Sequence, residues 1–113
     1  MHFIDVLATS TLSSIGSPMM GSVQNGVRYP LKNITFANVE VEVPGGGTTV
    51  PISPAEPTGG YPEFNMFGTL PASAYYFRHV DGLSFSNCRT TLQATDARAP
   101  AAFIDVTQMS GMP

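Results

Sequence analysis

Residues 61–80, YPEFNMFGTLPASAYYFRHV, combine the two kinds of side chain that could hold a sugar. The segment contains six of the eleven aromatic residues of the chain, and aromatic faces can stack on the apolar faces of pyranose rings. Carboxylate, amide and guanidinium groups between the rings can supply directed hydrogen bonds. The candidate ligand contacts are Tyr61, Glu63, Asn65, Arg78 and His79.

Packing is the favoured interpretation of the same aromatic cluster. Phe64, Met66 and Phe67 can fold a long loop back onto the body of the protein, and each contributes about 1.5–3 kcal/mol if fully buried. Arg78 and His79 are adjacent in a predicted strand, where neighbouring side chains point to opposite faces. One of these two residues is therefore expected to be structural.

The remaining reactive residues do not form a recognisable cluster. Each of the four aspartates lies beside a predicted corner or turn, where capping of the local backbone is the ordinary role. Cys88 is the single cysteine, so no internal disulfide is possible, and its alternating apolar context predicts a small buried side chain. No histidine, cysteine or carboxylate has metal-site spacing. The sequence predicts neither a metal nor a cofactor. The four aspartates are Asp5, Asp81, Asp96 and Asp105.

Length and charge restrict the possible functions. The chain has 113 residues and a net charge of −3, which predicts one domain, residues 1–113, without a basic patch for nucleic acid. Apolar runs are far shorter than the roughly 20 residues that span a bilayer. The start, MHFIDVLATS, has no basic residue before its apolar run, so no ordinary signal peptide is expected.

Short alternating apolar runs predict strands, and two of these runs repeat each other. LKNITFANVEVEV at 31–43 returns as VDGLSFSNCRTTL at 80–92. Asn38 and Asn87 fall at the same place in both copies, where a strand is expected to bend, because asparagine tolerates the left-handed backbone conformation. A second, shorter repeat places AFIDVTQM at 102–109 on YFRHVDGL at 76–83, and FIDV also occurs at 3–6.

These repeats favour a β-solenoid of about four coils, in which inward side chains of successive coils stack. The alternative is an antiparallel β-sandwich, which needs tight hairpin turns; the candidates are Asn25-Gly26 and Asp81-Gly82. Residues 44–63 are rich in Gly and Pro and are expected to protrude as a loop. Residues 8–26, Ser- and Gly-rich and poorly patterned, are expected to form a loop that covers one end.

In the order of its parts the chain resembles glycoside hydrolase family 28, the polygalacturonase-like, pectin-degrading enzymes. The resemblance covers residues 20–110 and rests on PLKNITFANVEVEVPGGGT, the Pro-rich loop, YPEFNMFGTLPASAYYFRHVDGLSFSNC and DARAPAAFIDV. It implies the C-terminal coils of a right-handed parallel β-helix. It also implies pectic oligosaccharide as a ligand. The sequence leaves the compartment open; the location is extracellular or periplasmic if the full-length family protein is secreted.

The same resemblance argues against catalysis by this chain alone. The family's catalytic motifs, NTD, DD, GHG and RIK, do not occur in the sequence. Inverting hydrolysis needs two paired carboxylates, and the aspartates here are scattered. The expected function is therefore that of a non-catalytic β-helix portion of a polygalacturonase-like protein; the alternative is a stand-alone β-rich structural or protein-interaction module. An uncovered solenoid end also predicts homo-oligomers or another association through that end.

Overall fold

The computed structural model describes residues 1–9, 19–46 and 71–113. These ranges contain strands and turns and no helix, so the described part is all-β, as the sequence predicts. None of its elements is a helix that could span a membrane. The strands are β1 (His2–Thr9), β2 (Met19–Met20), β3 (Ser22–Gln24), β4 (Val27–Tyr29), β5 (Leu31–Val43), β6 (Ala72–Ser86), β7 (Arg89–Leu92) and β8 (Ala99–Ser110).

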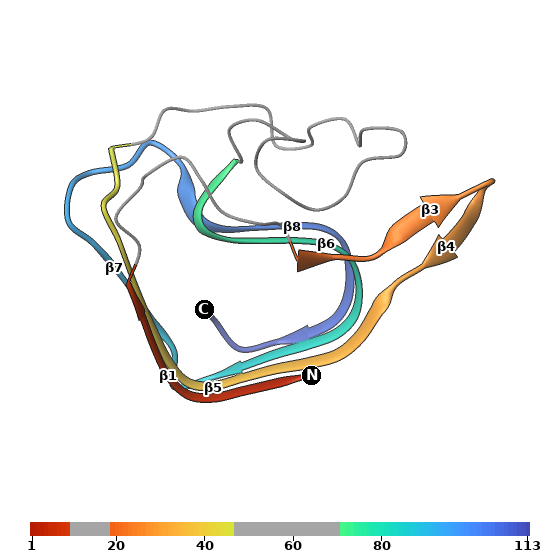
Figure 1. Ribbon diagram of the computed structural model, residues 1–113, viewed down its shortest axis with the longest axis horizontal. Coiled ribbons are helices and arrows are strands. Elements are labelled where there is room, and N and C mark those ends of the chain that lie inside the picture. The colour runs from red at the N-terminus through yellow and green to blue at the C-terminus, as the bar shows by residue number, and fades with distance from the viewer. Residues whose placement is uncertain (10–18, 47–70) are drawn as a thin grey trace.

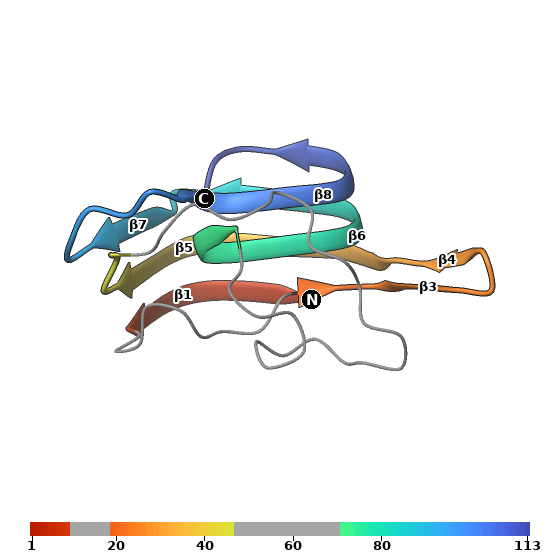
Figure 2. The same cartoon turned by 90° about the horizontal axis from the view of Figure 1, so that it is seen from above.

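Most of the sheet is parallel. β1 pairs with β5, β5 pairs with β6 and β7, and β6 pairs with β2 and β8, all in parallel. β3 and β4 form a separate antiparallel pair. In Figure 1, β1 runs alongside β5 and β8 runs alongside β6 on closely similar bent paths, and Figure 2 shows β1, β5, β6 and β8 one above the other. Segments far apart in the sequence are thus stacked as successive layers.

The register of β5 on β6 agrees with the longer of the two sequence repeats. Ile34 pairs with Leu83, and Phe36 pairs with Phe85. Because the pairs are in register, inward side chains of one layer stand on inward side chains of the next. The shorter repeat is also confirmed, since β6 and β8 pair the residues that it aligns, among them Phe77 with Phe103, Val80 with Val106 and Leu83 with Met109.

The strands bend where single residues adopt positive φ. Asn38 and Asn87 both have φ 54°, so the predicted asparagine bend is confirmed, and Asp5 (φ 55°) occupies the same place in β1. Asparagine and aspartate tolerate this left-handed conformation better than bulky residues do. Two further bends align in the same manner; one holds Asn33, Gly82 and Gln108, and the other holds His79 and Asp105.

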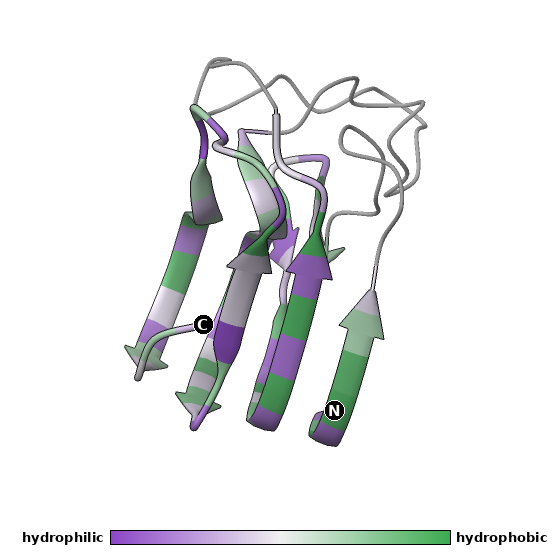
Figure 3. Ribbon diagram, turned by 90° about the vertical axis from the view of Figure 1, so that its left-hand side faces the viewer, coloured by the Kyte–Doolittle hydropathy of each residue, from purple (hydrophilic) through white to green (hydrophobic). Residues whose placement is uncertain are grey.

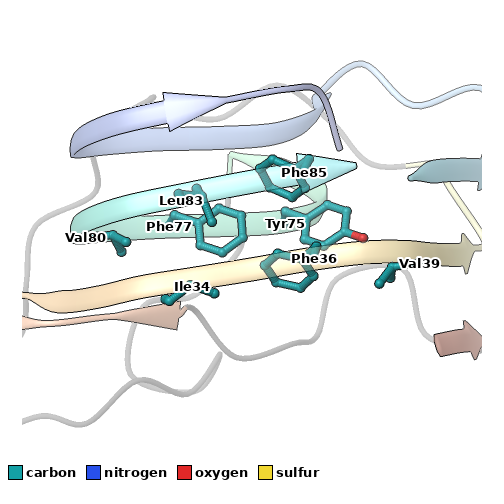
Figure 4. Close-up of a cluster of buried hydrophobic side chains, with 8 residues drawn as sticks. All are labelled: Ile34, Phe36, Val39, Tyr75, Phe77, Val80, Leu83 and Phe85. Atoms are coloured by element: carbon teal, nitrogen blue, oxygen red, sulfur yellow. The ribbon is translucent and has the colours of Figure 1, made fainter. Parts of the chain in front are cut away.

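Aromatic rings fill the interior of the stack. Phe36 lies between Phe3 (ring centroids 4.9 Å apart) and Phe85 (5.1 Å), with the rings nearly parallel. Phe77 stacks on Phe103 at 5.7 Å and meets Phe85 edge-on. Figure 3 shows hydrophobic and hydrophilic bands alternating along β5, the pattern of a strand with one buried face. The core side chains in Figure 4 are Ile34, Phe36, Val39, Tyr75, Phe77, Val80, Leu83 and Phe85.

Half of the aromatic segment at 61–80 belongs to the buried part of the protein. Tyr75, Tyr76 and Phe77 are all buried in β6, so this half of the cluster packs the protein interior. The other half lies at 61–67, outside the described residues. Strand β5 ends at Val43, directly before the predicted loop at 44–63, of which the structure describes only 44–46.

The β3–β4 hairpin is an insertion at one bend. Met20 pairs with Arg78 and Leu31 pairs with Val80, so residues 21–30 take the place that His79 alone occupies in β6. A Cβ on Gly21 would meet the carbonyl oxygens of Tyr29 and His79, so only glycine fits where the hairpin leaves the sheet.

Two sequence expectations about turns need correction. Asn25 (φ 51°) and Gly26 (φ 75°) do form a hairpin turn, but Asp81-Gly82 does not, because Gly82 (φ 87°) serves as a bend within the continuous strand β6. Residues 8–26 are not all loop, because they include β2, β3 and the end of β1. Strands this short leave almost no periodicity in the sequence.

Candidate functional site

A cluster of charged side chains gathers where the hairpin meets β6 and β8. Arg28 of β4 donates from Nη1 to Asp81 Oδ2 (2.8 Å), from Nε to Asp105 Oδ2 (2.6 Å) and from Nη2 to the Asp105 carbonyl oxygen (3.1 Å). Asp81 Oδ1 also accepts a hydrogen bond from Thr107 Oγ1 at 2.7 Å. One guanidinium therefore joins two carboxylates from adjacent layers.

His79 completes this cluster from inside the sheet. Its Nδ1 lies 2.7 Å from Asp105 Oδ2, and its side chain is buried. The stacking of β8 on β6 creates this contact, because His79 and Asp105 occupy equivalent bends in the two strands. We name Arg28, His79, Asp81, Asp105 and Thr107 the corner cluster.

The electrostatics of the corner cluster keep both carboxylates ionised. Hydrogen bonds from Arg28 and Thr107 lower the pKa of Asp81 from 3.8 to about 2. The contact with His79 and the hydrogen bond from Arg28 also lower the pKa of Asp105. In turn, the pKa of Arg28 is raised by hydrogen bonds to Asp81 and Asp105. A general acid needs the opposite shift, a raised carboxyl pKa. The cluster is suited to fastening the hairpin.

Only two of the five predicted ligand contacts lie in the described residues. His79 is buried against Asp105, whereas the neighbouring Arg78 donates from Nη1 to the hydroxyl of Tyr76 at 3.2 Å. The two residues thus have different partners, as their adjacent positions predict. Tyr61, Glu63 and Asn65 lie outside the described residues. Ligand contact by these five residues remains a prediction.

The four aspartates have more varied roles than simple caps. Asp96 is local, because it binds the backbone N–H and the guanidinium of Arg98, and Asp5 accepts a hydrogen bond from Asn38 at the bend. Asp81 and Asp105 instead join separate layers through Arg28. The shorter repeat aligns His79 with Asp105, so the contact between these two residues of the corner cluster could have been predicted from the sequence. Nothing in the sequence links Arg28 to either carboxylate.

A second polar site lies at the asparagine bend. Asn87 Nδ2 donates to Asn38 Oδ1 at 2.7 Å, and Asn38 Nδ2 donates to Asp5 Oδ1 at 2.9 Å, so three layers are joined by side-chain hydrogen bonds. Beside them Arg89 Nη2 lies 3.0 Å from Glu40 Oε1, and the Arg89 side chain is 73% exposed. An open cavity of about 470 Å³ is lined by Asn38, Val39, Glu40, Asn87, Cys88 and Arg89.

Cys88 contributes a free thiol to this cavity. Its Sγ lies 3.5 Å from the carbonyl oxygen of Phe36, and the side chain packs against the core. Within residues 1–9, 19–46 and 71–113, no three His, Cys, Asp or Glu side chains gather as metal ligands.

The chain matches no protein-family model, no curated protein and no solved structure.

Proposed function

We propose that the chain is a non-catalytic part of a right-handed parallel β-helix of the polygalacturonase-like kind, and that it contacts pectic polysaccharide. One observation carries the proposal: Ile34 and Phe36 stack in parallel register on Leu83 and Phe85. Stacking of successive turns of the chain over a shared interior is how a solenoid buries its apolar side chains. The aligned bends support the same architecture, because each layer must turn where its neighbour turns.

The corner cluster supports a non-catalytic role. Asp81 and Asp105 are both held by Arg28, and the pKa of each carboxyl is lowered. Inverting glycoside hydrolysis needs one carboxylic acid that is protonated at the working pH and one carboxylate that is free to activate water. Neither carboxylate of this cluster meets the first requirement.

The cavity at the asparagine bend is the described site best suited to an acidic sugar. The exposed guanidinium of Arg89 can bind a uronate carboxylate, and the amides of Asn38 and Asn87 can bind hydroxyl groups. Glu40 opposes this binding, because its carboxylate competes for Arg89. The proposal therefore predicts that Arg89 of β7 strengthens binding of the acidic sugar and that Glu40 of β5 weakens it.

Titration of the full chain with oligogalacturonides, followed by amide chemical shifts, tests the proposal. We expect shifts at Asn38, Asn87 and Arg89, at least about tenfold weaker binding for Arg89→Gln, and tighter binding for Glu40→Gln. Neutral oligogalactose is the control ligand. Unchanged spectra at millimolar acidic sugar would refute the ligand assignment, and release of reducing ends from polygalacturonate would refute the non-catalytic assignment.

One observation favours the second candidate function, a structural or interaction module that associates through the end of the stack. Ile4 and Leu7 of β1 are exposed although they are large and apolar, and most of β1 is coloured hydrophobic in Figure 3. In the described part, β1 pairs with β5 and with no other strand. Loss of self-association in Leu7→Lys, measured by sedimentation, would support this candidate; unchanged sedimentation would count against it.

A further inference from the structure

The turn of the β3–β4 hairpin consists of Asn25 and Gly26. Gln24 pairs with Val27, so these two residues alone reverse the chain, with φ 51° and 75°. Both residues are exposed, and Figures 1 and 2 show the hairpin projecting outward from the layers. In the described residues β3 and β4 pair only with each other. The turn can therefore change its shape without disturbing the parallel stack.

An asparagine side chain can react with the backbone nitrogen of the residue that follows it. The nitrogen forms a bond to Cγ, and Nδ2 leaves as ammonia with the proton that this nitrogen gives up, which closes a five-membered succinimide ring. Water then opens the ring. Cleavage at Cγ leaves aspartate, and cleavage at the main-chain carbonyl leaves isoaspartate, in which the main chain runs through Cγ. Because both reacting groups belong to one chain, water is the only other reagent.

Gly26 is a favourable neighbour for this reaction. It has no side chain to shield its nitrogen, and a Cβ built on it would meet no atom within 4 Å, so the ring has open space. The pairing of β3 with β4 stops at Gln24 and Val27, which leaves the Gly26 N–H outside the ladder. The attacking nitrogen is therefore neither crowded nor held in a strand pair.

The other asparagines that the structure describes lie in less reactive surroundings. Of the five asparagines in the sequence, only Asn25 precedes a glycine. Asn38 and Asn87 each donate a hydrogen bond from Nδ2, the atom that would have to leave. Asn33 precedes Ile34, which is 1% exposed. All four described asparagines have positive φ, so it is the surroundings that distinguish Asn25.

We infer that Asn25 is a site of spontaneous deamidation in the folded protein, through a succinimide formed with the Gly26 nitrogen. Each event replaces a neutral amide with a carboxylate, so the net charge of −3 gains one negative charge and becomes −4. The isoaspartate product adds one atom to the main chain of a two-residue turn, so the pairing of Gln24 with Val27 is lost. The change is confined to the hairpin, because no strand of the described stack pairs with β3 or β4.

Incubation of the folded full chain at mildly alkaline pH tests the inference, because base removes the proton from the attacking nitrogen. Peptide mass spectrometry follows each asparagine over time, and anion exchange separates the molecules that carry the added charge. We expect Asn25 to convert at least about tenfold faster than Asn33, Asn38 or Asn87. Gly26→Ala should slow the conversion of Asn25 by about tenfold or more, because a methyl group then shields the nitrogen, and should leave the other rates unchanged. Circular dichroism checks that the variant is folded.

A second sample, unfolded in urea, separates the effect of the fold from that of the sequence. Without the fold, Asn38 and Asn87 lose their hydrogen bonds and should react faster than in the native chain. Asn25 should keep its native rate to within about tenfold. Conversion of Asn25 in urea but not in the folded chain would overturn the inference. Equal rates at Asn25 in the wild type and in Gly26→Ala would overturn it as well.

Discussion

Asn87 lies directly above Asn38, and its Nδ2 donates to Asn38 Oδ1 at 2.7 Å while both residues hold φ 54°. The two asparagines are far apart in the sequence and occupy the same bend of adjacent layers. Each therefore permits a bend in its own strand and fixes the neighbouring layer to it.

Replacement of Asn38 should separate these two contributions. Asn38→Ala loses both side-chain hydrogen bonds and places alanine in the left-handed region, so we expect a loss of about 1–3 kcal/mol in unfolding free energy. Asn38→Gly loses the hydrogen bonds but keeps the backbone conformation, and should lose about 1 kcal/mol or less. Urea denaturation measures both; equal losses would show that the bend conformation contributes little.

The ion pair of Asp96 and Arg98 should be important for stability because it is buried. Its side chains are 0% and 2% exposed, and Arg98 Nη2 lies 2.9 Å from Asp96 Oδ2. Removing either side chain breaks a buried ion pair, so Asp96→Ala and Arg98→Ala should each cost about 3–5 kcal/mol. The double variant should cost much less than the sum. Additive losses in chemical denaturation would contradict this coupling.

Acid should weaken the attachment of the hairpin. The pKa of Asp81 falls from 3.8 to about 2 on folding, and that of Asp105 is also lowered, because Arg28, His79 and Thr107 surround them and Lys32 adds positive charge to Asp81. Lowered carboxyl pKa values stabilise the fold fully above about pH 4, and this stabilisation is lost as the pH falls toward 2.

The matched variant for this prediction is Arg28→Gln. It should be less stable than the wild type at pH 6, and the two urea midpoints should converge by about pH 2. Midpoints that stay equally far apart from pH 6 to pH 2 would show that the carboxylates do not act through Arg28.

Alkali should act on Tyr75. Burial, and to a lesser extent the nearby Cys88, raises the pKa of this phenol from 10 to about 12. Because burial disfavours the phenolate in the folded state, this group leaves stability unchanged below pH 10, and stability falls as the pH rises from 10 toward 12, where the unfolded chain ionises more readily than the folded one. Tyr75→Phe should therefore show a smaller loss of stability between pH 9 and 11 than the wild type.

At neutral pH the same variant should be as stable as the wild type or more stable. The Tyr75 hydroxyl is buried without a hydrogen-bond partner among the described residues, so its removal leaves no group unsatisfied. Thermal denaturation and phenolate absorbance measure the two effects. A large loss of stability at neutral pH would indicate that the hydroxyl has a partner in solution.

The repeats predicted much of this stack because parallel layers place equivalent residues above one another. The longer repeat gives the register of β6 with β5, and the shorter repeat gives its register with β8. FIDV occurs both at 3–6 and at 103–106, but in the described residues β1 pairs with β5 and β8 pairs with β6, so Phe3 lies on Phe36. A matching tetrapeptide identifies a similar local conformation and does not identify its neighbour.

The corner cluster was harder to predict for a physical reason. Its carboxylates follow from stacking, but Arg28 lies on a hairpin that repeats nowhere in the chain, and its contacts span 53 and 77 residues. Asp81-Gly82 resembled a hairpin turn because the dipeptide alone does not distinguish chain reversal from a bend. β6 is paired with β5 and β8 on both sides of Gly82, so the chain bends there and does not reverse.

The hairpin shows where this architecture can accommodate insertions during evolution. A whole segment, 21–30, stands in one layer where His79 stands in the next, and the pairing resumes at once on either side. Between the bends the spacing is fixed, because Asn33 precedes Asn38 by the same interval that separates Gly82 from Asn87. Lineages of this protein should therefore gain and lose sequence at the corners, while the straight stretches between them keep a constant length.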